Sequence, residues 1–270
     1  MAADTLTDIV AHPRLFAVPT FTDNYVWGLR AVGSRDCLVV DPGDAGPVAA
    51  ALERTGLRLT AILVTHHHGD HTGGIRVLKT PGVTVYGPRH EIIPLADHAC
   101  GDGDRIALPG LGEFRVIDVP GHTAGHIAYA GMLDERPLLF CGDTLFSAGC
   151  GRLFEGTAEE MHASLRTLAA LPPDTLVCCT HEYTLGNLRF AAAVEPGNAD
   201  IAACSHWARA QRDAGLPTLP GDLARELRVN PFLRTGVTEV RSAAARHAGQ
   251  APDSDAAVFA ALRRWKDTFH

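Results

Sequence analysis

The sequence predicts an α+β protein in which a strand-rich part is followed by a helical domain. Short apolar runs separated by glycine and proline recur as far as residue 172, as is typical of strands. Segments with the apolar spacing of helices dominate after Pro172-Pro173. The charge divides at the same place, because residues 1–172 hold 13 basic and 20 acidic side chains and residues 173–270 hold 11 of each. We therefore expect two domains, 1–172 and 173–270.

The first part begins with strands and contains two clear helices. Ala61 to Val64 is continuously apolar, which is typical of a strand buried on both faces. Thr157 and Glu160 have the spacing of a capping box at the start of the second helix. The expected strands cover 15–21, 25–31, 37–41, 61–64, 83–86, 114–119, 127–130 and 138–141, and the expected helices cover 47–54 and 157–171.

The second part starts with one more apolar strand and is helical from there on. In the last helix an apolar stripe of Val258, Phe259, Leu262 and Trp265 would dock it against the rest of the protein. The expected strand covers 176–179, and the expected helices cover 185–194, 199–214, 223–229, 237–248 and 255–269.

The composition excludes several classes of protein. With 46% hydrophobic and 20% charged residues the chain is an ordinary globular one, and its net charge of −7 argues against a nucleic-acid binder. No apolar run approaches the roughly 18 residues that span a bilayer. Residues 1–16 contain acidic side chains and no apolar core of a secretory signal. The seven cysteines have no repeated spacing, so we expect reduced thiols and a cytoplasmic protein.

The most informative feature is a cluster among the 14 histidines. Residues 65–71 read THHHGDH directly after the buried strand. His66 and His68 are two residues apart, so an extended turn would aim both rings the same way, whereas His67 would point elsewhere. Asp70 and His71 follow in the expected first turn of a helix. Several imidazole and carboxylate groups within six residues suit a divalent metal such as zinc.

Three further motifs of the same form follow strands later in the chain. They are GHTAGH with His122 and His126, GDT with Asp143, and THE with His181. Any one of them is most simply an ordinary polar loop. Because sites gather at the carboxyl ends of strands, the four motifs together predict convergence on one sheet edge.

The four motifs in this order resemble the metallo-β-lactamase superfamily, which implies a four-layer αββα sandwich. Further segments resemble glyoxalase II, the hydroxyacylglutathione hydrolases, whose C-terminal α-helical domain most superfamily members lack. These segments are FTDNYVW (21–27), FSAGCGRLFEGTAEEM (146–161), HEYTLGNLRFA (181–191), VEPGN (194–198), NPFLR (230–234) and RRWKDTF (263–269).

The resemblance implies two divalent metal ions, usually zinc, with iron or manganese also accepted. It implies that His66, His68 and His122 hold the first ion, that Asp70, His71 and His181 hold the second, and that Asp143 bridges both. The implied reaction is hydrolysis of S-D-lactoylglutathione and other S-2-hydroxyacylglutathiones to glutathione and the hydroxy acid. A metal-bridging hydroxide performs it, with Asp70 and Asp143 as catalytic residues, in the second step of methylglyoxal detoxification. The roles of His126 and Asp41 stay open between orienting a ligand and a purely structural part.

The resemblance also implies how the substrate is bound. Arg263 and Lys266 share a face of the last helix and would hold the glycine carboxylate of glutathione. Arg152 and Tyr183 would bind near the peptide part, and Phe154 is a further substrate-binding position. Position 152 is Arg where some members have Lys, position 154 is Phe where others have Tyr, and position 186 is Gly where Asn is frequent. We expect a monomer whose partner is this small molecule, and neither nucleic acid nor membrane.

Three alternative functions are set against this interpretation. A persulfide dioxygenase of the same superfamily needs one iron on His66, His122 and Asp143 only, and generally lacks the helical tail. A β-lactamase or lactonase lacks the tail as well. A non-catalytic metal-binding module would not need a complete ligand set, which this chain has.

Overall fold

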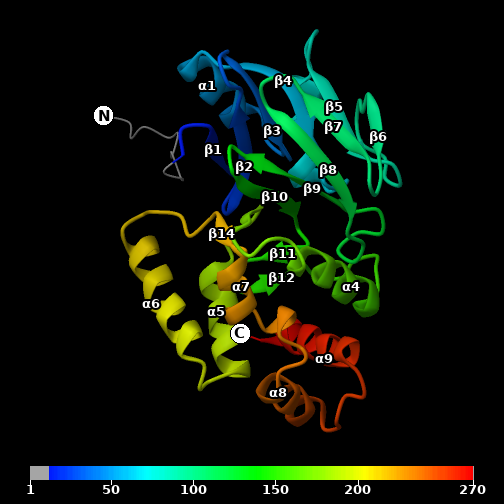
Figure 1. Ribbon diagram of the computed structural model, residues 1–270, viewed down its shortest axis with the longest axis vertical. Coiled ribbons are helices and arrows are strands. Elements are labelled where there is room, and N and C mark those ends of the chain that lie inside the picture. Colours follow the sequence, from blue (N-terminus) through cyan, green and yellow to red (C-terminus); the bar gives the residue numbers. More distant parts are fainter. Residues whose placement is uncertain (1–11, 270) are drawn as a thin grey trace.

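The computed structural model describes residues 12–269 and contains two six-stranded mixed sheets. Figure 1 shows the strands in the upper half of the molecule and most of the C-terminal helices in the lower half. The expectation about the N-terminal signal concerns residues 1–16, of which residues 1–11 lie outside the described part. None of the helices within 12–269 combines the length and apolar character needed to cross a bilayer.

The first sheet has the strand order β1-β2-β3-β4-β5-β6. Strands β1 to β3 pair antiparallel, and β3 to β6 pair parallel. Parallel pairing places the chain that leaves β3, β4 and β5 at a common edge. The bounds are β1 Leu15–Thr20, β2 Asn24–Arg30, β3 Asp36–Val40, β4 Arg58–Leu63, β5 Thr84–Pro88 and β6 His98–Cys100.

The second sheet has the order β14-β13-β10-β9-β8-β7, with β10 and β13 parallel. Strand β13 follows Pro172-Pro173 in the chain and still belongs to this sheet. A two-stranded ribbon, β11 Leu145–Phe146 and β12 Gly149–Cys150, follows β10. The sheet strands are β7 Arg105–Leu108, β8 Gly112–Asp118, β9 Ile127–Leu133, β10 Arg136–Gly142, β13 Leu176–Cys179 and β14 Gly221–Asp222.

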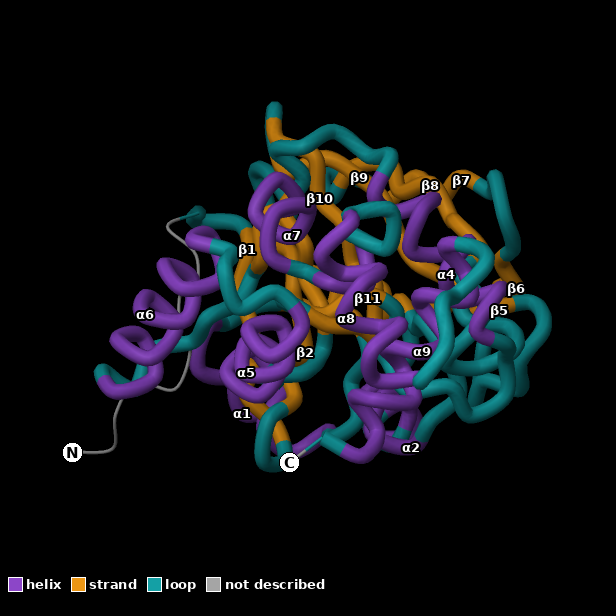
Figure 2. The backbone as a smooth tube through the Cα atoms, turned by 90° about the horizontal axis from the view of Figure 1, so that it is seen from below, coloured by secondary structure: helices purple, strands orange, loops and turns teal. Residues whose placement is uncertain are grey.

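The helices fall into those that cover the sheets and those of the C-terminal part. The first set is α1 Ala45–Thr55, α2 Gly69–Thr72, α3 Ile75–Leu78 and α4 Ala158–Ala169. The second set is α5 Thr184–Val194, α6 Ala199–Asp213, α7 Leu223–Val229, a 3-10 turn at Pro231–Leu233, α8 Thr238–Ala248 and α9 Asp255–Thr268. In Figure 2, which looks from below, α5, α7, α8 and α9 lie in front of the strands, in agreement with Figure 1.

The core is divided by the first sheet. Side chains on one face of this sheet, such as Trp27, pack with Phe114 and Tyr129 of the second sheet. Alternate residues on the other face, such as Phe16 and Ile62, pack beneath α1 and α3. The second sheet shares its apolar cluster with α4 and the C-terminal helices. The αββα sandwich with a C-terminal helical part is therefore confirmed.

Most long elements lie where the sequence predicts them. The capping box of α4 is present, since Glu160 N donates to Thr157 Oγ1 and Thr157 N donates to the Glu160 carboxylate. The residues of Ala61 to Val64 are at most 1% exposed, as expected for a doubly covered strand. Short strands β6, β7, β11, β12 and β14 were not predicted, because two to four residues give no readable alternation.

Main-chain contacts between segments distant in the chain assemble the edge where the loops with the predicted metal ligands lie. Ile127 N donates to Thr65 O at 2.9 Å, which links the start of β9 to the loop after β4. Tyr25 N donates to Thr180 O at 2.8 Å, which links the first hairpin to the loop after β13. Four loops from two sheets are thus brought to one place by backbone hydrogen bonds and sheet order.

Candidate active site

The seven side chains predicted as metal ligands converge at this edge. His66 and His68 follow β4, Asp70 and His71 lie on α2, His122 follows β8, Asp143 follows β10, and His181 follows β13. Their donor atoms form groups within 4.8 Å that include His66–His68–His122 and Asp70–His71–His181. We call these the first group and the second group.

The first group is built from three imidazoles that point at one another. Nδ1 of His68 lies 3.1 Å from Nε2 of His66 and 3.1 Å from Nε2 of His122. The Nδ1 of His122 donates to the carbonyl oxygen of Arg152 at 2.9 Å. That carbonyl only accepts, so the proton of neutral His122 is on Nδ1 and the lone pair of Nε2 faces the group.

The tautomer of His66 follows from the same reasoning. Its Nδ1 lies 3.1 Å from Thr65 Oγ1, and Thr65 Oγ1 donates to Asp41 Oδ2 at 2.7 Å. Because the Thr65 hydroxyl donates its only proton to Asp41, its oxygen acts as an acceptor towards His66, and the proton of His66 is on Nδ1. The lone pair of His66 Nε2 therefore also points into the first group.

The second group is oriented by carboxylates. His181 Nδ1 donates to Asp23 Oδ1 at 2.7 Å, and His71 Nδ1 lies 3.1 Å from Asp41 Oδ2. Both Nε2 atoms consequently face Asp70 Oδ2, at 3.5 Å from His181 and 3.6 Å from His71.

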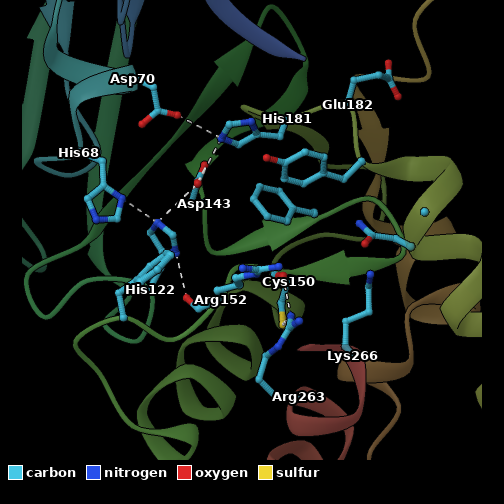
Figure 3. A pocket seen from close by; sticks show the side chains of 15 residues that line it. His68, Asp70, His122, Asp143, Cys150, Arg152, His181, Glu182, Arg263 and Lys266 are labelled. Carbon is cyan, nitrogen blue, oxygen red and sulfur yellow. Dashed lines mark hydrogen bonds and ion pairs between the residues drawn. The ribbon is translucent and has the colours of Figure 1, made fainter. Parts of the chain in front are cut away.

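Asp143 lies between the two groups. Its Oδ1 is 3.4 Å from Nε2 of His71, and its Oδ2 is 3.3 Å from Nε2 of His181 and 3.5 Å from Nε2 of His122. One carboxylate thus contacts imidazoles of both groups. Figure 3 shows Asp143 between His122 and His181, with Asp70 and His68 to the left of Asp143.

The two groups differ in protonation as well as in geometry. Burial lowers the pKa of His66 well below its usual value, and it also lowers the pKa of His68 and His122. Burial opposes charge on the second group too, but Asp143 and Asp23 together outweigh it and raise the pKa of His181 to about 9. Asp143 and Asp41 together raise the pKa of His71.

The Asp143 carboxyl responds in the opposite sense. Burial alone would raise its pKa, but the imidazoles of His71 and His181 hold that pKa well below its usual value. Asp143 is therefore an anion at neutral pH, and its two oxygens can interact with positive charge in both groups.

Unsatisfied buried atoms indicate that this donor set suits metal ions. Both ring nitrogens of His71 and Oδ1 of Asp143 are buried and make no hydrogen bond with the described residues, although His71 Nδ1 has its ion-pair contact with Asp41. Orphaned buried polar atoms are costly unless a ligand satisfies them. Donors on one tetrahedral zinc, each about 2.0–2.1 Å from it, are about 3.3 Å apart. The separations of 3.1 to 3.6 Å between facing atoms fit divalent ions held by nitrogen and oxygen.

Two residues whose roles the sequence left open support the site. Asp41 accepts from Thr65 N and Oγ1 and faces His71, so it orients both groups at once. His126 accepts from Asp143 N at 3.2 Å and stacks on His66 with centroids 4.6 Å apart. A side chain at Gly142 would meet Thr65 Oγ1 at 2.3 Å, and its φ of +47° also favours glycine. His126 and Asp41 both hold ligand-bearing segments in position.

Sequence reasoning missed three other supports, Asp23, Asn24 and Glu91. Asp23 holds His181, and Asn24 Nδ2 donates to Asp70 Oδ2 at 3.0 Å. Asp23 lies in the turn between β1 and β2, Asn24 is the first residue of β2, and Glu91 lies in the loop after β5. The only signal for the first two was a polar turn inside FTDNYVW; nothing in the sequence distinguishes Glu91.

A cavity of about 750 Å³ opens beside the two groups. Figure 3 shows His68, Asp70, His122, Asp143 and His181 on one side of it and Arg263 and Lys266 of α9 on the other. Phe154 packs edge-on to His122, and Tyr183 stacks on His181 with rings 4.7 Å apart and 5° between their planes. The structure therefore brings all five predicted substrate contacts to this cavity. Its lining residues are His68, Asp70, His122, Asp143, Phe146, Cys150, Arg152, Phe154, His181, Glu182, Tyr183, Gly186, Asn187, Arg263 and Lys266.

The cations of the cavity wall are not equivalent. Arg263 is buried, donates through Nη1 to Cys150 O at 3.1 Å and through Nη2 to Asp267 Oδ1 at 2.9 Å. Within residues 12–269, Arg152 and Lys266 have no acidic partner. Burial, with help from Arg263, Arg189 and Arg152, lowers the pKa of Lys266. The wall thus offers positive charge that the protein itself does not neutralise.

None of the seven cysteines is in a disulfide, and all seven are buried. Cys150 is the one that lines the cavity, and burial raises the pKa of its thiol to about 11. A thiol in this state is a poor nucleophile at neutral pH.

Comparisons with known proteins agree with this geometry. A family model described as "Hydroxyacylglutathione hydrolase C-terminus" matches residues 182–269, and one described as "Metallo-beta-lactamase superfamily" matches residues 21–181. The chain is 54% identical over 258 residues to a hydroxyacylglutathione hydrolase of Pseudomonas aeruginosa, covering 95% of this chain and 99% of that protein. It is 54% identical over 247 residues to one of Halorhodospira halophila, covering 91% and 95%.

Solved structures agree at the level of the fold. The crystal structure of ETHE1 from Myxococcus xanthus superposes with a TM-score of 0.62, covering 95% of this chain and 99% of that chain. At 23% identity this likeness concerns the fold alone.

Proposed function

The chain belongs to the hydroxyacylglutathione hydrolases of the metallo-β-lactamase superfamily, which are thioester hydrolases, and we propose that it hydrolyses S-D-lactoylglutathione and related S-2-hydroxyacylglutathiones. The products are glutathione and D-lactate, as in the second step of methylglyoxal detoxification. The single observation that carries the proposal is the junction of two imidazole–carboxylate groups with a cavity whose far wall is cationic.

Two divalent ions, with zinc as our first choice and iron or manganese as alternatives, would be held by the two groups. His66, His68 and His122 would hold one ion, Asp70, His71 and His181 the other, and Asp143 both. When bound, such a pair supplies a water of low pKa as the nucleophile and polarises the thioester carbonyl. The orphaned atoms of His71 and Asp143 support this assignment.

The protein's own groups prepare the site in three ways. Thr65, Arg152 O, Asp23 and Asp41 fix the ring orientations, which keeps the Nε2 atoms of His66, His122, His71 and His181 directed inward. Asp143 and Asp70 supply two of the negative charges that would offset two divalent cations, and we assign them the catalytic role of fixing the position of the nucleophile. No side-chain nucleophile is required, in keeping with the high pKa of Cys150.

The cavity suits glutathione in size and charge. Glutathione has two carboxylates and one ammonium group, so it carries a net charge of −1 at neutral pH. Lys266 and Arg152, which have no acidic partner in the described chain, would bind its carboxylate and peptide ends. Arg263 would contribute its positive charge while holding Cys150 and Asp267. Phe154 and Tyr183, which pack on His122 and His181, would contact the substrate next to the two groups.

The remaining expectations extend the same proposal. We assign residues 1–172 to a metal-binding catalytic domain and residues 173–270 to a helical substrate-binding domain that contributes His181. We expect a monomer in the cytoplasm that acts on a small molecule.

The decisive experiment combines metal analysis with a thioester-cleavage assay. The purified protein is expected to carry about two metal equivalents per chain and to release glutathione from S-D-lactoylglutathione in preference to β-lactams and lactones. Oxygen consumption with glutathione persulfide that exceeds thioester cleavage would favour the single-iron dioxygenase instead. Metal below one equivalent with no turnover would favour a non-catalytic module.

A further inference from the structure

Glu91 lies outside both groups but connects two of the loops that carry them. It follows β5, and its side chain is only 3% exposed. Buried carboxylates are rare unless they are paired or hydrogen-bonded, so its contacts need an explanation.

Each oxygen of Glu91 serves a different loop. Oε2 accepts from His67 N at 2.5 Å and lies 2.9 Å from His67 Nδ1. Oε1 accepts from Thr123 Oγ1 and from Gly125 N, the latter at 3.1 Å. A single carboxylate therefore fastens the loop after β4 to the loop after β8.

The fastened residues are immediate chain neighbours of the first group. His67 precedes His68, and Thr123 follows His122. Nδ1 of His68 and Nε2 of His122 are 3.1 Å apart. The second group has two supports of its own, Asp23 and Asn24, and it shares Asp41 with the first group. We propose that Glu91 is a positioning residue that sets the spacing of His68 and His122, and thereby the affinity of the first group for its metal. The inference rests on the metal assignment in the proposed function.

A glycine lets the loop after β8 come close to the Glu91 side chain. A Cβ at Gly125 would lie 2.6 Å from Glu91 Cγ and 3.0 Å from the backbone of His90, so only glycine fits there. On the other side of the His67 ring, Glu155 Oε1 lies 3.3 Å from Nε2, and Glu155 Oε2 accepts from Ala124 N at 2.9 Å. Glu155 is 41% exposed and touches the same two loops, which makes it a matched comparison.

A third metal ion at His67, Glu91 and Glu155 is the competing explanation, because their ligand atoms lie within 4.8 Å. Both oxygens of Glu91 are already occupied by donors from the protein. A carboxylate engaged in this way has its lone pairs directed at N–H and O–H groups, which favours positioning over ligation.

The test measures metal affinity at each site in Glu91→Gln. The amide keeps the shape but offers one acceptor oxygen, so its NH₂ group must face the donors of one loop. Metal-free protein, titrated with Co²⁺ against a chromophoric chelator, is expected to show one affinity lowered 10–100-fold and the other changed less than threefold. Glu155→Gln should change both less than threefold, since an exposed pair contributes little.

Activity gives an independent readout. In Glu91→Gln, kcat is expected to fall with metal occupancy and to recover in excess metal, while KM changes less than threefold. Adding Asp23→Asn should then lower the second affinity as well, which assigns the first loss to the first group. Equal loss at both sites, unchanged affinities, or loss of a third metal equivalent would each overturn the proposal.

Gly125→Ala is the second variant, for use where Glu91→Gln does not fold. Its methyl group would displace Glu91 without removing the carboxylate, and the same one-site loss is expected. These affinities are measured without substrate. If the wild-type protein fails to cleave lactoylglutathione, that result contradicts the proposed function. The inference about Glu91 is then still decided by the metal affinities of Glu91→Gln alone.

Discussion

The first and second groups are similar in donor number but differ in what holds their rings. A hydroxyl and a main-chain carbonyl orient His66 and His122, whereas carboxylates orient His71 and His181. A carboxylate that accepts a hydrogen bond from one imidazole nitrogen makes the other nitrogen a more basic ligand for a metal ion. The second group therefore depends on charged partners for its donor strength, and the first depends on the spacing of its loops. The two-metal site that we propose would therefore be prepared by charged partners in one half and by the spacing of loops in the other.

The largest effect is expected where the two groups meet. Asp143→Ala removes the one carboxylate in contact with both, so metal content should fall at both sites and kcat/KM by at least about 10³-fold, or about 4 kcal/mol. Metal analysis and the thioester assay measure these losses. The exposed Asp174→Ala should change neither. Two-metal occupancy in Asp143→Ala would contradict a shared role.

A smaller effect should separate the groups. Asp23→Asn keeps an acceptor for His181 Nδ1 but removes the charge, so the affinity of the second site is expected to fall about 10–100-fold. Calorimetric titration of metal-free protein measures both affinities. If the first site weakens equally, the two groups do not have separate supports.

The cavity wall gives the next effect. Lys266→Ala removes a cation with no acidic partner, so KM for lactoylglutathione should rise about tenfold at similar kcat, as loss of uniform binding does. Arg263→Ala should raise KM too, and should also lower the free energy of unfolding by about 1–3 kcal/mol, because the carbonyl of Cys150 loses a buried donor. Steady-state kinetics and denaturant titration separate the two. An unchanged KM in either variant removes that residue from the substrate site.

The smallest effect is a pH dependence of the metal-free protein. The folded pKa of His181 is about 9, above its ordinary value of 6.5. Its stabilising contribution is therefore fully present below pH 6.5 and is lost as the pH rises towards 9. The melting temperature of chelator-treated protein should fall over this range, and in His181→Asn it should fall less. A pH dependence that is the same in His181→Asn as in the unchanged protein would show that His181 does not contribute to it.

Sequence patterns predicted the parts of this molecule that follow a general rule of strand and loop order. Apolar strands followed by ligand-type residues predicted the edge where His66, His122, Asp143 and His181 meet, and the motifs predicted the family, which the comparisons confirm. Which nitrogen of His68 faces the group was not predictable, because spacing fixes the direction of a chain and not the rotation of a ring.

The supports escaped prediction for a different reason. Asp23 is 158 residues from His181, and Glu91 is 32 residues from Thr123. An acidic residue in a turn is ordinary, and only the folded sheets show what it touches. Arg263 is a similar case, since its helix face was foreseen but its hydrogen bond to Cys150 O depends on where the β11–β12 ribbon lies.

The stacking of Tyr183 on His181 ties the entrance of the cavity to the chemistry behind it. The chain passes from the predicted ligand His181 to Tyr183 and into α5 within a few residues. A substitution that moves the backbone or the ring at this rim would therefore also shift the imidazole of His181. Phe154 also packs on a predicted ligand, His122, but it is 63% exposed, against 42% for Tyr183, and lies 32 residues from His122 in the chain. Selection for new acyl substrates would therefore find more freedom on the Phe154 side.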